Sequence, residues 1–182
     1  RDGVYMAKYI YWLKNQVKNG ANLTEKTASD YLDNLRREDE LFLDLSFPTI
    51  SGYADNGAIV HYEAEYETAK KLEAKGLYLF DSGATYKDGT TDVTRTISLG
   101  ENTYEEKLHY TLVTIGMLRL LNTTFKRGAI GVCLDIKARE ALWEYGLDYN
   151  HGTGHGVGFV NTVHEAPTSI RNKINKDLFR NL

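Results

Sequence analysis

The sequence is poor in cysteine and proline, and what it lacks excludes several classes of protein. Its single cysteine, Cys133, has no partner for an internal disulfide and predicts a reducing compartment, so we expect a cytoplasmic protein. No apolar run approaches the length of a membrane-spanning helix, and no basic-then-apolar leader of the secretory kind opens the chain. The net charge of −3 gives no reason to expect nucleic acid or an anionic membrane as a partner.

What is present is the composition of a globular domain. Apolar residues make up 42% and charged residues 26% of 182 residues, which is enough to bury a core. The chain begins at Arg1 rather than a methionine and stops at Leu182 without a closing element. We therefore expect residues 1–182 to be one incomplete domain excerpted from a longer polypeptide.

Hydrophobic periodicity predicts helices that flank antiparallel strands, an α+β arrangement. Apolar spacings of three and four predict a helix over residues 4–18, and Thr24 caps a second helix that runs into a solvated stretch at 36–40. Further helices are expected over 103–125 and 135–145.

Short strands are expected between these helices. They should occupy 41–62, with turns at Ser51-Gly52 and Asp55-Asn56-Gly57, and a short turn or helix should follow near 63–75. Residues 77–80 form an apolar run, and 90–99 alternate with a period of two, so the turn signal at 87–89 predicts a hairpin. The glycine-punctuated stretch 151–167 should be strand and loop.

Two aspartates flank this hairpin. Asp81 follows the apolar run, and Asp92 lies on the returning strand. Burying an ionised carboxylate is expensive, and two that converge repel each other unless a divalent cation compensates them. The alternative is two turn-flanking aspartates that cap backbone N–H groups, and the spacing alone does not decide between the two.

The histidines favour a metal site. Three of the five histidines, His151, His155 and His164, fall within fourteen positions of a glycine-rich segment, where backbone can approach a ligand closely. His109 lies within a predicted helix and is interpreted as structural. Imidazole and carboxylate together suit zinc, manganese, cobalt or iron, and ligand type leaves that choice open.

Other catalytic interpretations fail. Cys133 has no histidine or glycine-rich context and is interpreted as a core cysteine rather than a nucleophile. The glycine motif lacks the lysine and hydroxyl residue of a phosphate-binding loop. Ser82 does not lie in the Gly-x-Ser-x-Gly pattern of a nucleophile elbow.

Several segments together resemble the Xaa-Pro aminopeptidases, a branch of the creatinase-like "pita-bread" metallopeptidases of family M24. The segment FDSGATYKDGTTDVTRT (80–96) is similar to their first metal-ligand hairpin, and HGTGHGVG (151–158) with VHEAP (163–167) to their histidine-ligand loop. RDG (1–3) and DLSFPTI (44–50) are similar to the opening helix and first strand of their catalytic domain.

The resemblance implies a fold and an activity. The fold would be the pita-bread fold, a curved antiparallel sheet flanked by helices, truncated here on its C-terminal side. The activity would be hydrolysis of the N-terminal Xaa-Pro peptide bond by a hydroxide that bridges two divalent ions, most often Mn²⁺, with Zn²⁺ or Co²⁺ as alternatives. The substrate would be a peptide with proline at its second position, and the resemblance is compatible with a homodimer.

The resemblance also implies roles for six residues. Asp81 would chelate one metal ion, Asp92 would bridge both, and His155 would bind the other. The remaining histidines would act on the substrate. His61 and His164 would hold the substrate or the tetrahedral intermediate, and His151 would line the proline pocket.

The sequence departs from the family pattern at its end. The family uses two further glutamate ligands, in Glu-Pro-Gly and Arg-x-Glu segments beyond the histidine loop, and no glutamate follows Glu165 here. Glu165 itself matches a different family position. We therefore expect the 182 residues alone to bind metal poorly and to hydrolyse nothing.

Three alternatives to an aminopeptidase follow from the same resemblance. A prolidase would cleave dipeptides alone. A creatinase would need no metal, which disagrees with the ligand-type residues at 81, 92 and 155. A non-catalytic binding module of the same fold would be expected to have lost such residues.

Overall fold

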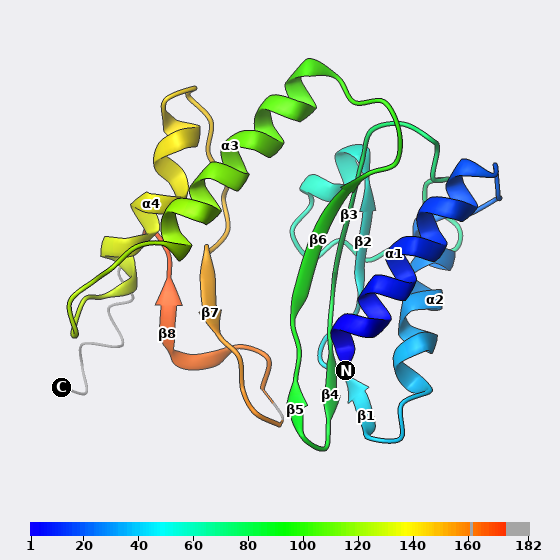
Figure 1. Cartoon of the computed structure of the whole chain (residues 1–182), viewed down its shortest axis with the longest axis horizontal. Coiled ribbons are helices and arrows are strands. Elements are labelled where there is room, and N and C mark those ends of the chain that lie inside the picture. Colours follow the sequence, from blue (N-terminus) through cyan, green and yellow to red (C-terminus); the bar gives the residue numbers. More distant parts are fainter. Residues whose placement is uncertain (161, 174–182) are drawn as a thin grey trace. The chain divides into compact units, whose positions relative to one another are not determined.

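The computed structural model describes residues 1–160 and 162–173, and these form two compact units (Figure 1). The first unit comprises Arg1–Thr103 with Val157–Val163, and the second begins with Tyr104–Gly156 and resumes at His164. Each unit contains helices and antiparallel strands, as expected for an α+β chain.

Two helices open the first unit where periodicity predicts them. They are α1 (Asp2–Lys18) and α2 (Glu25–Arg37). Thr24 caps α2 as expected, because its hydroxyl accepts a hydrogen bond from the Thr27 N–H at 3.2 Å.

The strands of the first unit form two small antiparallel sheets. One sheet has the order β2-β3-β6 and the other β1-β4-β5. Their bounds are β1 (Phe42–Leu45), β2 (Ile50–Tyr53), β3 (Leu77–Ser82), β4 (Ala84–Tyr86), β5 (Gly89–Thr90) and β6 (Val93–Ser98).

The predicted hairpin is confirmed, but it is interrupted. β3 pairs with β6 and β4 pairs with β5, so the two arms run antiparallel up to the turn at 87–88. The expected single strand over 90–99 is wrong, because residues 91 and 92 leave the ladder between β5 and β6. Gly83 marks the matching break in the other arm.

The turn expected at Ser51-Gly52 is also wrong, since both residues lie inside β2. Glycine is needed there for a close approach, because a Cβ on Gly52 would lie 2.7 Å from the backbone nitrogen of Gly57. The second expected turn is a 3-10 helix, η1 (Ala54–Ala58), and a turn at 66–68 lies within the stretch 63–75.

The core of the first unit packs α1 and α2 against β2 and β3. Tyr9 of α1 contacts Phe80 of β3 edge-to-face, with ring centroids 5.0 Å apart. The hydroxyls of Tyr9 and Tyr78 are 2.8 Å apart, so the polar ends of these buried rings satisfy each other.

Arg36 contradicts the expectation of a solvated run at the end of α2. Its side chain is fully buried and forms an ion pair with Asp2 of α1. Its spacing of four residues from Leu32, and of eight from Ala28, places it on the buried face of the helix.

The second unit packs two helices together and carries a two-stranded sheet. The elements are α3 (Tyr104–Leu121), α4 (Gly131–Trp143), β7 (Gly154–Gly156) and β8 (Glu165–Ile170). α3 is shorter than expected, and α4 begins four residues before the expected 135. β7 and β8 confirm the expectation of strand and loop over 151–167.

Cys133 of α4 is exposed, so its assignment to the core is wrong. None of the helices in the described part of the chain combines the length and apolar character that crossing a bilayer requires.

Candidate metal centre

Asp81 lies near the end of β3, the central strand of its sheet. It stands opposite Ile50 of β2 and Thr94 of β6. Its Oδ1 atom is buried, and no described residue donates a hydrogen bond to it. A buried carboxylate oxygen without a donor is costly, and a bound cation is one way to offset that cost.

Asp92 lies beside the strand that carries Asp81. It directly precedes Val93, and Val93 pairs with Ser82, the neighbour of Asp81. The sheet register therefore brings the two aspartates to the same end of the β3–β6 ladder, as the hairpin interpretation predicted.

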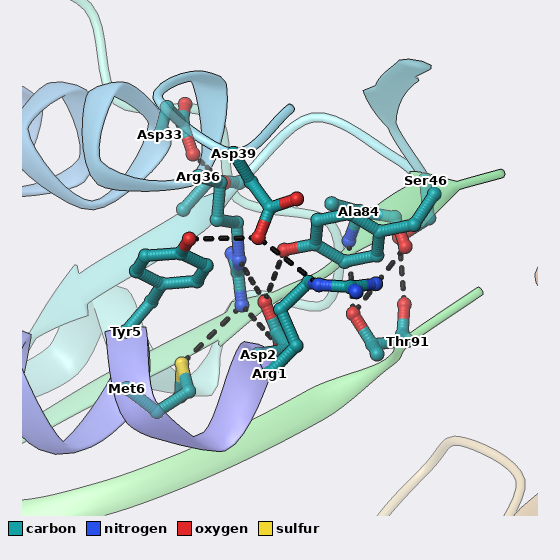
Figure 2. Close-up of polar contacts among 12 residues, drawn as sticks. Arg1, Asp2, Tyr5, Met6, Asp33, Arg36, Asp39, Ser46, Ala84 and Thr91 are labelled. Atoms are coloured by element: carbon teal, nitrogen blue, oxygen red, sulfur yellow. Dashed lines mark hydrogen bonds and ion pairs between the residues drawn. The ribbon is translucent and has the colours of Figure 1, made fainter. Parts of the chain in front are cut away.

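The backbone before Asp92 is held by hydrogen bonds around Thr91. The Thr91 N–H donates to the Ala84 carbonyl at 2.9 Å, and the Ala84 N–H donates to the Thr91 hydroxyl at 3.0 Å. The Ser46 hydroxyl donates to the Thr91 carbonyl at 2.8 Å (Figure 2). These contacts fix the point at which the chain enters Asp92.

Gly83 makes this arrangement sterically accessible. A Cβ atom at this position would lie 1.9 Å from the Thr91 carbonyl oxygen and 2.4 Å from the Ser46 hydroxyl. Since real contacts are never this short, the Asp81 strand and the Asp92 segment approach each other closely because residue 83 has no side chain.

The other end of the hairpin is attached to the first helices. Asp2 accepts hydrogen bonds from Arg36 Nε at 2.8 Å, from Arg36 Nη2 at 3.1 Å and from the Tyr86 hydroxyl of β4 at 2.8 Å (Figure 2). Burial raises the pKa of Asp2, but the hydrogen bonds and charge of Arg36 outweigh it and hold the pKa below its ordinary value. Asp2 is therefore ionised and joins α1, α2 and β4.

His61 lies in the loop after η1, exposed and with a backbone φ of 61°. A left-handed conformation in a residue other than glycine costs of order 1–3 kcal/mol and is common at functional sites. The role expected for His61 stays a prediction.

The neighbouring Tyr62 ties this loop to a buried carboxylate. Its hydroxyl donates to Glu25 Oε2 at 2.9 Å. The same fully buried carboxylate accepts from the backbone N–H groups of Tyr53 at 2.6 Å and Lys70 at 2.8 Å. Burial and the Glu25 charge raise the pKa of Tyr62 to about 12, so its hydroxyl stays protonated as the donor.

In the second unit, His151 and His155 present their rings in the same way. Nδ1 of each ring is 2.8 Å from the carbonyl oxygen of the following glycine, Gly152 or Gly156. A carbonyl only accepts, so Nδ1 donates in this contact, and in a neutral ring the lone pair is then on Nε2. Histidine metal ligands are commonly oriented by such a carbonyl contact.

His164 lies against His155. Their rings meet edge-to-face with centroids 4.2 Å apart, and both residues are exposed. His164 directly precedes β8, which pairs with the β7 strand that carries His155. His151 packs instead beside Tyr149, with ring centroids 4.7 Å apart.

The residues present fit a divalent cation. Asp81 offers a buried acceptor oxygen that no described residue satisfies, and His155 has the tautomer that a metal ligand needs. The structure brings Asp81 and Asp92 together in the first unit and His155 and His164 together in the second. The assignment of individual roles to these residues stays a prediction.

The sequence interpretation missed the groups that support the site. Gly83 acts by letting backbone approach closely, and Thr91 acts through its hydroxyl and backbone; no periodicity reveals either contact. Arg36 was detectable, because it continues the buried face of α2 at helical spacing. Arg139, a buried residue of α4, was detectable from Asp135 four positions earlier on the same expected helix.

Comparisons with known proteins agree with this picture. The family model described as metallopeptidase family M24 matches residues 2–181. A probable Xaa-Pro aminopeptidase P from Tuber melanosporum is 46% identical over 174 residues, which are 96% of this chain and 28% of that protein. The chain thus spans less than a third of that relative.

Solved structures of other proteins share the fold, and two of them illustrate the range of identity. The X-prolyl aminopeptidase from Caenorhabditis elegans, described as a cytosolic enzyme with a di-nuclear active site, is 40% identical, with a TM-score of 0.92 over 97% of this chain and 29% of its own. The prolidase from Pyrococcus furiosus is 27% identical, with a TM-score of 0.72 over 83% of this chain and 43% of its own. The expected pita-bread fold is confirmed.

Proposed function

Because this chain belongs to metallopeptidase family M24, we propose that the protein containing it is a metal-dependent aminopeptidase that hydrolyses the N-terminal Xaa-Pro bond of peptides. The observation that carries this proposal is the buried Asp81 Oδ1 atom without a donor among the described residues. It lies in a chain 46% identical to a probable Xaa-Pro aminopeptidase P.

We assign the metal ligands of this chain to Asp81, Asp92 and His155. Two divalent ions, with Mn²⁺ as the proposed identity, would supply a water of lowered pKa and Lewis-acid polarisation of the scissile carbonyl. Carboxylate and imidazole donors accept both hard and borderline cations, so Zn²⁺ and Co²⁺ belong in the same titration.

The other histidines act on the substrate in this proposal. His61 and His164 hold the peptide and donate hydrogen bonds to the oxyanion that develops at the scissile carbonyl. His151 lines the pocket for the proline ring. The proposed location is the cytosol, in keeping with the description of the Caenorhabditis elegans enzyme.

Ligand variants with matched controls test the proposal. In the full-length protein, Asp81→Asn, Asp92→Asn and His155→Gln should lose bound metal and activity together, because each removes a donor. Asp88→Asn changes an exposed aspartate in the turn of the same hairpin and should retain both. Metal-free full activity of the wild type, or equal losses in Asp88→Asn, would contradict the proposal.

Substrate length separates the aminopeptidase from a prolidase. The prolidase alternative is favoured by the fold shared with the Pyrococcus furiosus enzyme. An aminopeptidase should cleave Ala-Pro-Pro and longer Xaa-Pro peptides, whereas a prolidase should cleave Gly-Pro and leave tripeptides intact. Binding of these peptides without cleavage by the metal-loaded protein would indicate a non-catalytic module.

The 182 residues alone provide a further test. Lacking the expected glutamate ligands, they should bind metal at less than full stoichiometry and show no Xaa-Pro cleavage. Turnover by this fragment at the rate of the full-length protein would refute the ligand assignment.

A further inference from the structure

A buried ion pair within α4 lies against the segment that carries His151 and His155. Arg139 Nε donates to Asp135 Oδ2 at 2.6 Å, and the side chains are 0% and 2% exposed. Both residues belong to α4, one helical turn apart, so the helix holds the pair in place.

The rest of the Arg139 guanidinium binds the segment that leads to the histidines. Nη1 donates to Asp148 Oδ1 at 2.7 Å and to the Tyr149 carbonyl at 2.6 Å, and Nη2 donates to the His151 carbonyl at 2.8 Å. The guanidinium carbon lies 3.8 Å from the centroid of the Tyr149 ring. One side chain therefore fixes the backbone at two positions, including that of His151 itself.

The second carboxylate oxygen of Asp135, Oδ1, binds the other end of the same segment. Thr153 donates from its hydroxyl to Asp135 Oδ1 at 2.5 Å, and the Tyr149 hydroxyl lies 2.5 Å from the same Thr153 oxygen. The Thr153 N–H donates to the Ile170 carbonyl of β8 at 2.9 Å. Thr153 directly precedes β7, which presents His155 two residues later.

Burying such a pair contributes little net stability, because desolvation of both charges offsets their attraction. What the planar guanidinium supplies is geometry, since its donors have fixed directions and bind several acceptors at once. Among the described residues, the acceptors of Arg139 outside its own helix lie between 148 and 151, on the approach to His155.

We propose that Asp135, Arg139 and Thr153 are positioning residues that hold segment 148–155 so that the His151 and His155 rings are presented for substrate and metal. They act through the backbone and do not touch the reacting atoms. This inference rests on the proposed function for its kinetic consequences, whereas the orientation of the rings can be measured in the metal-free protein.

Thr153 offers the sharper test, because its variants nearly preserve volume. In the full-length protein, Thr153→Val removes the hydroxyl that binds Asp135, and Thr153→Ser restores it. Loss of a group that orients a metal ligand typically lowers metal affinity roughly 10- to 100-fold. We expect a loss of that size and a lower kcat in Thr153→Val, with Thr153→Ser within about twofold of wild type.

Arg139→Lys, compared with a matched control variant, tests the contacts of the guanidinium. Lysine keeps the charge beside Asp135 but lacks the fork that reaches the Tyr149 and His151 carbonyls, so metal affinity should again fall. Arg119→Gln removes a partly exposed arginine of α3 that pairs with Glu140 of α4 at 3.2 Å and should leave metal affinity unchanged. If Arg139→Lys does not fold, the Thr153 pair decides the question.

A readout without metal separates this inference from the proposed function. Selective ¹⁵N-histidine NMR of the metal-free protein should show the Nδ1–H tautomer for His151 and His155 in wild type and Thr153→Ser, and tautomer averaging in Thr153→Val. Unchanged ring signals, or metal affinity of Thr153→Val within about twofold of wild type, would overturn the inference. A wild type that shows the ordered rings but neither binds metal nor cleaves peptides would instead overturn the proposed function.

Discussion

Replacing Arg36 by methionine should destabilise the first unit strongly, because it leaves the Asp2 carboxylate buried without a cation. Arg36 is 0% and Asp2 5% exposed, and Arg36 donates two hydrogen bonds to this carboxylate (Figure 2), besides the one from the Tyr86 hydroxyl. Removing one partner of a buried ion pair costs about 3–5 kcal/mol. The lower end of that range applies here, because Arg36 Nη1 is itself buried without a partner among the described residues.

The pH dependence of this cost has a defined sign. In wild type the pKa of Asp2 is below its ordinary value, because Arg36 outweighs the effect of burial. The contribution of the pair is complete above the ordinary pKa of about 3.9 and disappears only as the pH falls through the lower pKa of the folded state. In Arg36→Met, the hydrogen bonds of Tyr86 and Thr91 still lower the pKa of Asp2, but the charge and hydrogen bonds of Arg36 are lost; burial, the largest influence, should therefore raise this pKa above that of the unfolded chain.

The stability difference between the two proteins should therefore shrink as the pH falls. At neutral pH the variant carries the full cost of an unpaired carboxylate, and proton uptake by Asp2 relieves it as the pH falls through the raised pKa. Urea unfolding monitored by circular dichroism at pH 7, 6, 5 and 4 measures the free energy of unfolding directly.

The adjacent Arg37→Met is the matched control. Arg37 is exposed, with its guanidinium over the Phe42 ring, so the change should stay within about 0.5–1 kcal/mol. A difference below about 1 kcal/mol between wild type and Arg36→Met at pH 7 would refute the reasoning. So would a difference of the same size at every pH.

Two further predictions concern the supports of the candidate site. Gly83→Ala should lower metal affinity in the full-length protein by roughly tenfold or more, because the new Cβ would lie 1.9 Å from the Thr91 carbonyl oxygen and must push the Asp92 segment away. Calorimetric titration with Mn²⁺ measures this affinity. The control is Gly3→Ala, whose new Cβ meets no atom within 4 Å, and equal affinities of the two variants would contradict the prediction. Glu25→Gln should lower the pKa of Tyr62 from about 12 while leaving it above the ordinary value, because the carboxylate charge is lost and burial remains. Ultraviolet titration of tyrosinate, with Tyr62→Phe to assign the signal, checks the second result, and an unchanged titration would show that Glu25 does not act on this hydroxyl.

Much of the fold could be predicted from the sequence, because helices and strands produce local patterns of apolar and capping residues. The spacing of Tyr9, Leu13 and Val17 marks the buried face of α1, and Thr24 marks the start of α2. The alternation over 93–98 marks β6. In each case the hydrogen bonds that define the element join residues near in sequence, or the pattern reflects a single buried face.

The break in the hairpin and the start of α4 could not be predicted from the sequence. The break in the second arm of the hairpin depends on Ser46 and Thr91, which are forty-five positions apart and meet through a side-chain hydrogen bond. The early start of α4 places Gly131 where a Cβ would lie 1.8 Å from the Ser169 carbonyl oxygen of β8. Both contacts join residues that are far apart in the sequence, so no local sequence pattern predicts them.

The candidate site divides in the same way. Residue type and glycine context in the sequence singled out Asp81, Asp92 and three histidines as ligand-type residues, and the resemblance to Xaa-Pro aminopeptidases implied their roles. The tertiary structure decided which charged groups are buried, that Asp81 Oδ1 has no donor among the described residues, and that His155 Nδ1 faces a carbonyl oxygen. Those properties depend on desolvation and on hydrogen-bond partners from distant segments, and a linear sequence encodes them only through the completed fold.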